Sequence, residues 1–130
     1  MGDAGSIPLG FLAAAIGLLG WQKGLWPLWF PLVAFSTFIM DATVTLFKRL
    51  LRGERVWEAH REHYYQRVIQ MGWTHKKTAI AEYILMMISG LAGLIAMRLS
   101  PAYALLLILL CMSAKIFLMY LVDIKWQQRA

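Results

Sequence analysis

The sequence predicts an all-α fold: a polytopic integral membrane helical bundle of about four transmembrane helices with one cytoplasmic amphipathic helix. Of the 130 residues, 60% are hydrophobic, and the mean hydropathy is +0.58. A soluble chain of this size could not hide so much apolar surface in one core. The apolar residues form four segments, and the basic residues gather between the second and third, as is typical of a cytoplasmic loop.

Four apolar segments are expected to cross the membrane within a single membrane domain. The first, 7–21, would be about 22 Å long as a helix, which is short against a hydrocarbon core of about 30 Å. Its shortness suggests that the chain is truncated before Met1. The others, 25–47, 78–97 and 103–122, are each long enough to span with tilt.

Turn-forming and small residues organise the bundle. Gly20, Gly24, Pro27 and Pro31 are expected to shape the first outer turn and the start of the second span, and Ser100-Pro101 the second outer turn. Small side chains within the spans would let helices approach closely. These are Gly10, Ala14, Gly17, Ser89 and Gly93.

The charges predict the orientation. By the positive-inside rule, the long loop 48–77 and both termini lie in the cytoplasm. The net charge of +6 is explained by this loop lying near anionic lipid headgroups, so no nucleic acid is expected as a partner. The loop holds eight of the thirteen basic residues: Lys48, Arg49, Arg52, Arg55, Arg61, Arg67, Lys76 and Lys77.

The single cysteine and the N-terminus exclude two further features. Cys111 lies in an apolar run and has no second cysteine with which to form an intrachain disulfide, so we expect a buried packing residue. The first six residues carry Asp3 and no Lys or Arg, so the basic start of a signal peptide is missing.

The cytoplasmic loop carries an amphipathic pattern. Gly53 ends the preceding helix, and residues 56–71 are expected to form a helix that stops at Gly72. An apolar stripe on this helix would lie on the membrane or on the bundle. Its members are Trp57, Tyr64, Val68 and Met71.

A basic face lies beside that stripe, with His60, His63 and Arg67 at positions i, i+3 and i+7. It allows three interpretations. The face is a solvated basic surface; or the two histidines bind Zn²⁺, although no third ligand of the usual spacing follows; or arginine and imidazole recognise a phosphate. His75 is expected at the surface.

Two ionisable residues fall inside the predicted spans. Asp41 and Lys115 should each lie about 10 Å below the cytoplasmic surface, where charges are usually paired or face a cavity. We expect an Asp41–Lys115 ion pair or shared contact with a bound headgroup. The alternative is a helix-packing pair without a chemical role. Glu82 is expected at the interface.

The hexapeptide 1–6, Met-Gly-Asp-Ala-Gly-Ser, lies where a loop becomes a helix at the membrane edge. Glycines allow backbone to approach a phosphate, and the start of a helix favours anions. The Asp3 carboxylate is of the kind that holds Mg²⁺ against such a phosphate.

Together these features resemble the C-terminal part of the polyprenyl-phosphate N-acetylhexosamine-1-phosphate transferases, the glycosyltransferase-4-like integral membrane family of bacterial envelope synthesis. Residues 1–6 resemble the family motif Phe-(Met/Leu)-Gly-Asp-x-Gly-Ser without its leading Phe, and residues 59–67, Ala-His-Arg-Glu-His-Tyr-Tyr-Gln-Arg, resemble its loop motif. The run from Asp41 through Gly53 to this loop is similar to the branch that starts O-antigen and related polysaccharides. The peptidoglycan-precursor enzymes instead carry a triple histidine.

The resemblance implies a function. Members transfer a sugar 1-phosphate from a UDP-activated N-acetylhexosamine to undecaprenyl phosphate in the inner membrane, with Mg²⁺, and release UMP. Asp3 matches the metal-binding aspartate of the family. Arg61 and His63 match the loop motif placed over the nucleotide-sugar phosphates, and His60 matches only within this branch.

The chain also departs from the family. The paired aspartates and the nucleophile-region aspartate of the family lie on earlier spans, which have no equivalent here. We therefore expect a C-terminal portion that is inactive without the missing N-terminal half. The alternative is a non-enzymatic small four-span membrane protein. A channel or transporter is disfavoured because the polar residues gather at one membrane face.

Overall fold

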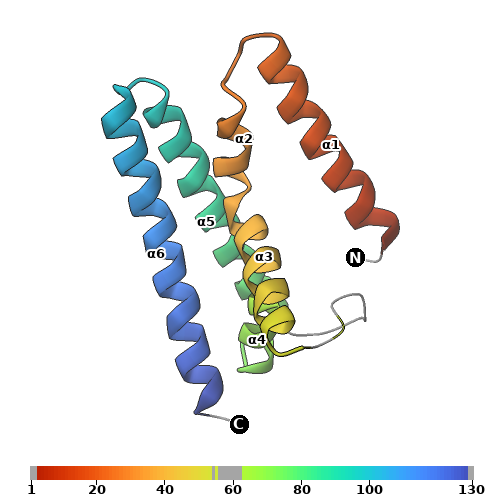
Figure 1. The fold of residues 1–130 in the computed structure, drawn as a ribbon. Helices are drawn as coiled ribbons and strands as arrows, with labels where there is room; N and C mark the ends of the chain where they lie inside the picture. The colour runs from red at the N-terminus through yellow and green to blue at the C-terminus, as the bar shows by residue number, and fades with distance from the viewer. Residues whose placement is uncertain (1–2, 54, 56–62, 129–130) are drawn as a thin grey trace.

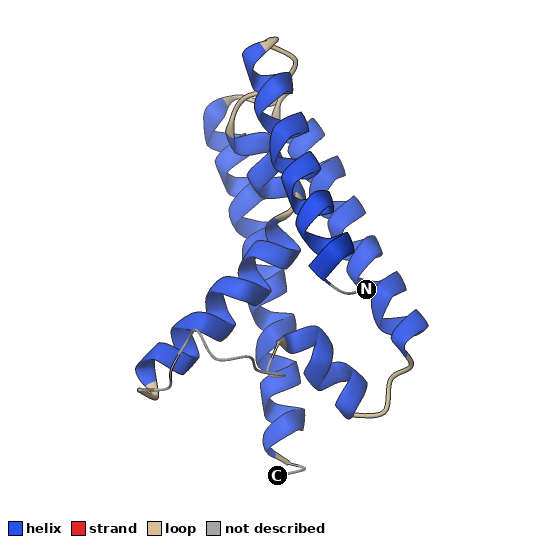
Figure 2. Cartoon of the chain, turned by 90° about the vertical axis from the view of Figure 1, so that its right-hand side faces the viewer, coloured by secondary structure: helices blue, strands red, loops and turns tan. Residues whose placement is uncertain are grey.

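The computed structural model describes the backbone of residues 3–53, 55 and 63–128, and side chains from residue 7 onward within those ranges. All regular structure in these ranges is helical, which confirms the all-α expectation. The helices are α1 (Asp3–Gln22), α2 (Trp29–Ala34), α3 (Ser36–Leu51), α4 (Tyr64–Gln70), α5 (His75–Ala96) and α6 (Pro101–Gln127) (Figures 1 and 2).

The long helices run up and down along a common direction. The connections after α1 and after α5 lie at one end of the bundle, and α4 lies at the other end, near the C-terminus of α6 (Figure 1). We call this second end the loop end. Ser100 and Pro101 begin α6 as predicted, and Gly72, with φ of +101°, follows α4.

Two helices in the described ranges, α5 and α6, are long and apolar enough to cross a membrane. They correspond to the predicted spans 78–97 and 103–122. The apolar part of α1, Ile7–Gln22, is shorter. The expected span 25–47 is divided into α2 and α3, so crossing by four helices stays a prediction.

The break between α2 and α3 occurs at Phe35, whose φ and ψ are −89° and 8°. Pro31 lies in the first turn of α2, where a missing N–H interrupts no helical bond, and its carbonyl accepts the Phe35 N–H at 3.0 Å. Just after the break, the Ser36 hydroxyl donates to the Val33 carbonyl, a back-bond that bends helices. The hydropathy of this segment did not reveal this signal.

Burial follows the pattern of a membrane protein. The outward side of α6 is apolar, with Leu106 and Leu110 more than half exposed, whereas the buried positions of α3 and α5 are mostly small or polar. Gly93 of α5 lies against Phe30 of α2, and Ser89 is fully buried, as expected for residues at which helices approach closely.

The predicted role of the small residues in α1 holds at only one end of the helix. Gly17 lies against Pro31, and its carbonyl accepts a hydrogen bond of 3.0 Å from the Trp26 indole. Gly10 has no neighbour within 4 Å of the position of a Cβ, and Ala14 is exposed. The close-packing expectation was therefore wrong for Gly10 and Ala14, because the start of α1 lies away from α2 (Figure 1).

Replacing Gly20 with Ala is expected to disrupt the packing of α1 on α2. A Cβ at Gly20 would lie 2.0 Å from the Trp26 ring, so the ring must move and its bond to Gly17 is lost. Overpacking of this kind costs about 1–3 kcal/mol. Thermal unfolding in lipid nanodiscs measures the effect. Gly10→Ala, in the same helix, is the matched control, and an equal loss of stability in both variants would contradict the prediction.

Candidate functional site

A group of ionic and phenolic side chains fixes α4 to the bundle at the loop end. The Asp123 carboxylate of α6 accepts hydrogen bonds from Lys48 of α3, from the Tyr64 hydroxyl at 2.9 Å and from Arg67 Nη1 at 2.9 Å. Lys48 Nζ also donates to the Tyr64 hydroxyl at 2.6 Å. We call these four residues the anchor network.

Arg67 corrects the expectation of a solvated basic face. This residue is buried, and its guanidinium stacks near the rings of Tyr64 and Trp126 at 5.2 and 5.8 Å from their centroids. It was wrongly grouped with solvent-facing residues because its partner Asp123 lies 56 residues away along the chain. The apolar stripe was better predicted, since Tyr64, Val68 and Met71 face the bundle interior.

Asp41 of α3 holds the first turn of α4. Its Oδ1 accepts the Tyr64 backbone N–H at 2.9 Å and the Thr45 hydroxyl at 3.1 Å, and it lies 3.4 Å from His63 Nδ1. His63 is the N-cap residue of α4, but its own side chain makes no capping bond. The carboxylate from another helix therefore takes the place of a local cap.

His63 is thereby placed at the loop end of the bundle. Its ring is stacked near Tyr65, with centroids 5.9 Å apart and planes 19° apart, and it lies at ion-pair distance from Asp41. An imidazole in this position could contact an anion. The arrangement suits the recognition of a negatively charged ligand.

The anchor network is expected to release α4 at alkaline pH. Burial lowers the pKa of Lys48, but hydrogen bonds to Asp123 and Tyr64 outweigh it and leave that pKa above 10.5. Burial raises the pKa of Tyr64 above 10.0, the Lys48 contact opposes this, and Asp123 adds to it. Both folded-state values lie above the unfolded ones, so the stabilisation is complete below about pH 10 and is lost as the pH rises through the folded values.

This pH dependence can be measured as the difference in phenolate absorbance between the wild-type chain and Tyr64→Phe. The Tyr64 phenolate should form only above the ordinary pKa of 10.0. Formation at or below that pH would contradict the prediction.

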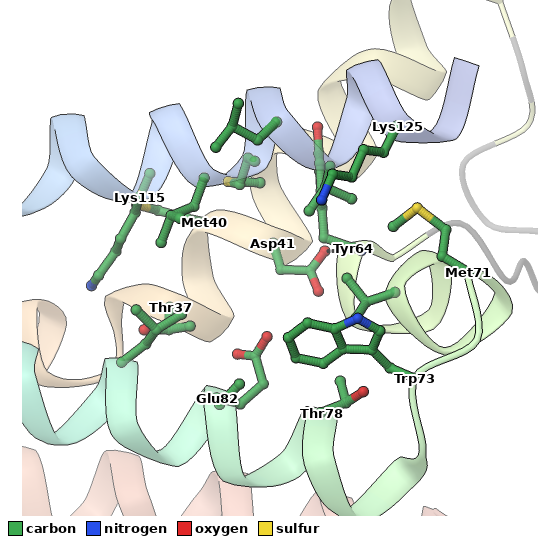
Figure 3. Close-up of a pocket in the computed structure, with 17 residues that line it drawn as sticks. Thr37, Met40, Asp41, Tyr64, Met71, Trp73, Thr78, Glu82, Lys115 and Lys125 are labelled. Atoms are coloured by element: carbon green, nitrogen blue, oxygen red, sulfur yellow. Dashed lines mark hydrogen bonds between the residues drawn. The ribbon is translucent and has the colours of Figure 1, made fainter. Parts of the chain in front are cut away.

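Two cavities lie beside the α3–α5 contact. One, of about 330 Å³, is bordered by α3, α4, α5 and α6, and the other, of about 450 Å³, by α3, α4 and α5. Both are lined by Asp41, Thr78 and Glu82, and the larger also by His63 and His75. In Figure 3 the carboxylates of Asp41 and Glu82 point toward one another across the smaller cavity.

The expected Asp41–Lys115 ion pair does not form. Lys115 Nζ donates to the Ser36 hydroxyl near the helix break, whereas the Asp41 carboxylate turns toward Tyr64 and His63. Both residues line the smaller cavity (Figure 3). The two residues share a cavity, but the direction of each side chain selected a different partner.

The structure describes some of the predicted site residues fully and others in part or not at all. His63 lies at the loop end as described, and His75 is exposed beside the larger cavity. Asp3 is the first residue of α1, and its side chain is not described. His60 and Arg61 lie outside the described residues.

Sequence reasoning missed Asp123 and the Tyr64 hydroxyl. A signal for Asp123 existed, because an acidic residue at the end of a span faces the basic loop. No local spacing could have named Lys48 and Arg67 as its partners, since they precede it by 75 and 56 residues.

The described side chains do not complete a metal site. Among them, no three His, Cys, Asp or Glu residues are grouped so as to hold a metal ion. The described part of the chain therefore does not by itself fit Mg²⁺ or the Zn²⁺ interpretation. Ligands for a divalent ion would have to include groups outside it, such as the Asp3 carboxylate.

Comparison with known proteins gives two curated relatives. The chain is 25% identical over 97 residues to the probable undecaprenyl-phosphate N-acetylglucosaminyl 1-phosphate transferase of Bacillus subtilis (strain 168), covering 73% of this chain and 27% of the relative. It is 34% identical over 104 residues to the phospho-N-acetylmuramoyl-pentapeptide-transferase of Chlorobium chlorochromatii (strain CaD3), covering 76% and 27%. No protein-family model and no solved structure matches the chain.

The chain thus spans about a quarter of the length of the curated relatives it matches. The two relatives come from different branches of sugar-phosphate transfer, so the similarity does not single out the O-antigen branch. Together with the apolar helices, it supports a membrane protein related to the phospho-sugar transferases.

Proposed function

We propose that the chain is the C-terminal portion of a membrane transferase that moves a sugar 1-phosphate from a UDP-N-acetylhexosamine to undecaprenyl phosphate in cell-envelope polysaccharide synthesis. The observation that carries the proposal is the attachment of His63 and α4 to the bundle at the loop end by Asp41 and Asp123. A loop held in this way can present imidazole and arginine groups to phosphates at a membrane surface.

The roles of the residues follow from their charge. His63, with His60 and Arg61, is proposed to bind the pyrophosphate of the nucleotide sugar and to offset charge on the departing UMP. Asp3 is proposed as the one Mg²⁺ ligand supplied by this chain. Since the described side chains do not complete a metal site, the further ligands and the nucleophile-region aspartate are assigned to the N-terminal half.

The proposed location is the bacterial inner membrane, with the loop and both termini in the cytoplasm. The excess of Lys and Arg in 48–77 supports this orientation. UDP-sugars are charged and water-soluble, whereas the prenyl acceptor is confined to the lipid. A site at the loop end could reach both substrates.

The test is transfer by a reconstituted protein. The purified chain in nanodiscs, given undecaprenyl phosphate, Mg²⁺ and UDP-N-acetylglucosamine, is expected to release no UMP. Co-expression with the N-terminal three quarters of the Bacillus subtilis relative should restore release. Sustained absence of UMP with that partner and with other UDP-N-acetylhexosamines would favour the non-enzymatic membrane protein.

Variants then test the proposed site within the restored activity. Asp3→Asn and His63→Ala should each abolish most of it, because each removes a group that contacts the phosphates or their metal. His75→Ala is the matched control, since His75 is exposed and has no proposed role. Full activity in His63→Ala would overturn the site assignment.

A further inference from the structure

The smaller cavity contains polar groups that the protein leaves unsatisfied. Thr37 is 9% exposed, and its hydroxyl has no hydrogen-bond partner among the described residues. Within the same part of the chain, the Glu82 carboxylate accepts no hydrogen bond, and the ammonium of Lys115 has one bond, to Ser36. Thr37, Glu82 and Lys115 come from α3, α5 and α6, and all three residues line the cavity of about 330 Å³, but the Thr37 hydroxyl oxygen is itself buried out of the reach of water.

Polar groups at such positions need partners. Burying an unbonded hydroxyl costs about 1–3 kcal/mol, and an isolated charge costs far more. Glu82 lies within electrostatic reach of Lys115 but makes no direct contact with it. Both residues line the cavity, so whatever fills the cavity must satisfy both charged groups.

The size and shape of the cavity indicate what fills it. At about 30 Å³ for each molecule, the volume has room for about ten waters. In Figure 3, Thr37, Lys115 and Glu82 lie toward one end, whereas Trp73 and Lys125 lie toward the loop end. Lys125 is exposed, so this second end meets solvent. A lipid hydrocarbon chain would cover the apolar walls but would add no hydrogen bond to either charged group.

We propose that this cavity is a hydration site: a water cluster, continuous with solvent at the loop end, that bridges the Lys115 ammonium to the Glu82 carboxylate. Each water supplies two donors and two acceptors, which matches a pair made of a cation and an anion. The bridge takes the place of a direct ion pair at this depth. It is independent of the transferase proposal.

Thiol accessibility tests for water. In a Cys111→Ala background, which removes the only native cysteine, Met119→Cys places a thiol on the cavity wall, and Phe117→Cys places one on the exposed apolar side of α6. Only a hydrated thiol ionises and reacts, so a membrane-impermeant methanethiosulfonate should modify Met119→Cys at least about tenfold faster. Equal rates, as expected for a cavity filled by lipid, would overturn the proposal.

A double-mutant cycle tests the bridge. Glu82→Gln and Lys115→Met should each lower the unfolding temperature in nanodiscs, and the double variant should lose less than the sum of the two single losses. The control cycle pairs Glu82→Gln with Lys125→Met at the solvent end, where the losses should add. Additive losses for Glu82 and Lys115 would refute the water-mediated coupling, whatever the transferase assay shows.

Discussion

Replacing Asp123 with Ala is expected to release α4 from the bundle. The carboxylate accepts from Arg67, Lys48 and Tyr64, so its loss removes a counter-charge that lies against a buried guanidinium and an ammonium. Breaking a buried ion pair in this way costs about 3–5 kcal/mol. The Lys48 side chain is 39% exposed against 9% for Arg67, so solvent screening reduces the Lys48 share and most of the loss arises at Arg67.

Hydrogen exchange by mass spectrometry measures the release. In nanodiscs, backbone amides of α4 (Tyr64–Gln70) should lose protection in Asp123→Ala, whereas those of α5 should not. Lys125→Ala, two residues further along α6, is the matched control because Lys125 is exposed and lies outside the anchor network. Unchanged protection of α4 in Asp123→Ala would show that the anchor network does not hold this helix.

Replacing Asp41 with Ala is expected to loosen the first turn of α4 without detaching the whole helix. The variant loses acceptors for the Tyr64 N–H and the Thr45 hydroxyl, and it removes the carboxylate beside His63. Loss of a capping acceptor costs about 0.5–2 kcal/mol. In the restored transferase, displacement of His63 should also reduce UMP release.

The pattern of exchange separates this effect from that of Asp123. In Asp41→Ala the amides of Tyr64 and Tyr65 should exchange faster, while Gln70 keeps its protection through the anchor network. Thr45→Val is the control, since it removes one hydrogen bond to Asp41 and leaves the cap in place. If Thr45→Val reproduced the exchange pattern of Asp41→Ala, loss of the cap would not be the cause of the faster exchange, because Thr45→Val keeps the cap.

The fold was predictable where one residue type dominates a long stretch. Continuous apolar runs gave α5 and α6, and glycine and proline gave their neighbouring turns. The division of 25–47 was not predicted, because the segment contains a single charged residue, Asp41, and its hydropathy gives no sign of an end at Phe35. The break coincides with a back-bond from Ser36 to Val33, a local effect that hydropathy does not register.

The candidate site was predictable at short range only. The step of four residues from Asp41 to Thr45 puts both on one helix face, where they are hydrogen-bonded. The sequence did not show whether Lys115 or His63 would lie beside Asp41. The answer depends on the path of the loop, which brings its backbone N–H groups back to α3. Charged side chains at a similar height in the bundle have several possible partners. Which pair forms depends on the three-dimensional path of the chain, which residue spacing does not reveal.

The position of Asp123 has a consequence for the order of assembly. A ribosome makes the loop before it makes α6, so α4 emerges before its main anchor exists. Docking of α4 must wait until the last helix is inserted. A chain that stops short of Asp123 would keep the helices before α6 and yet leave the loop undocked, so the last turns of α6 are needed to complete a surface made more than fifty residues earlier.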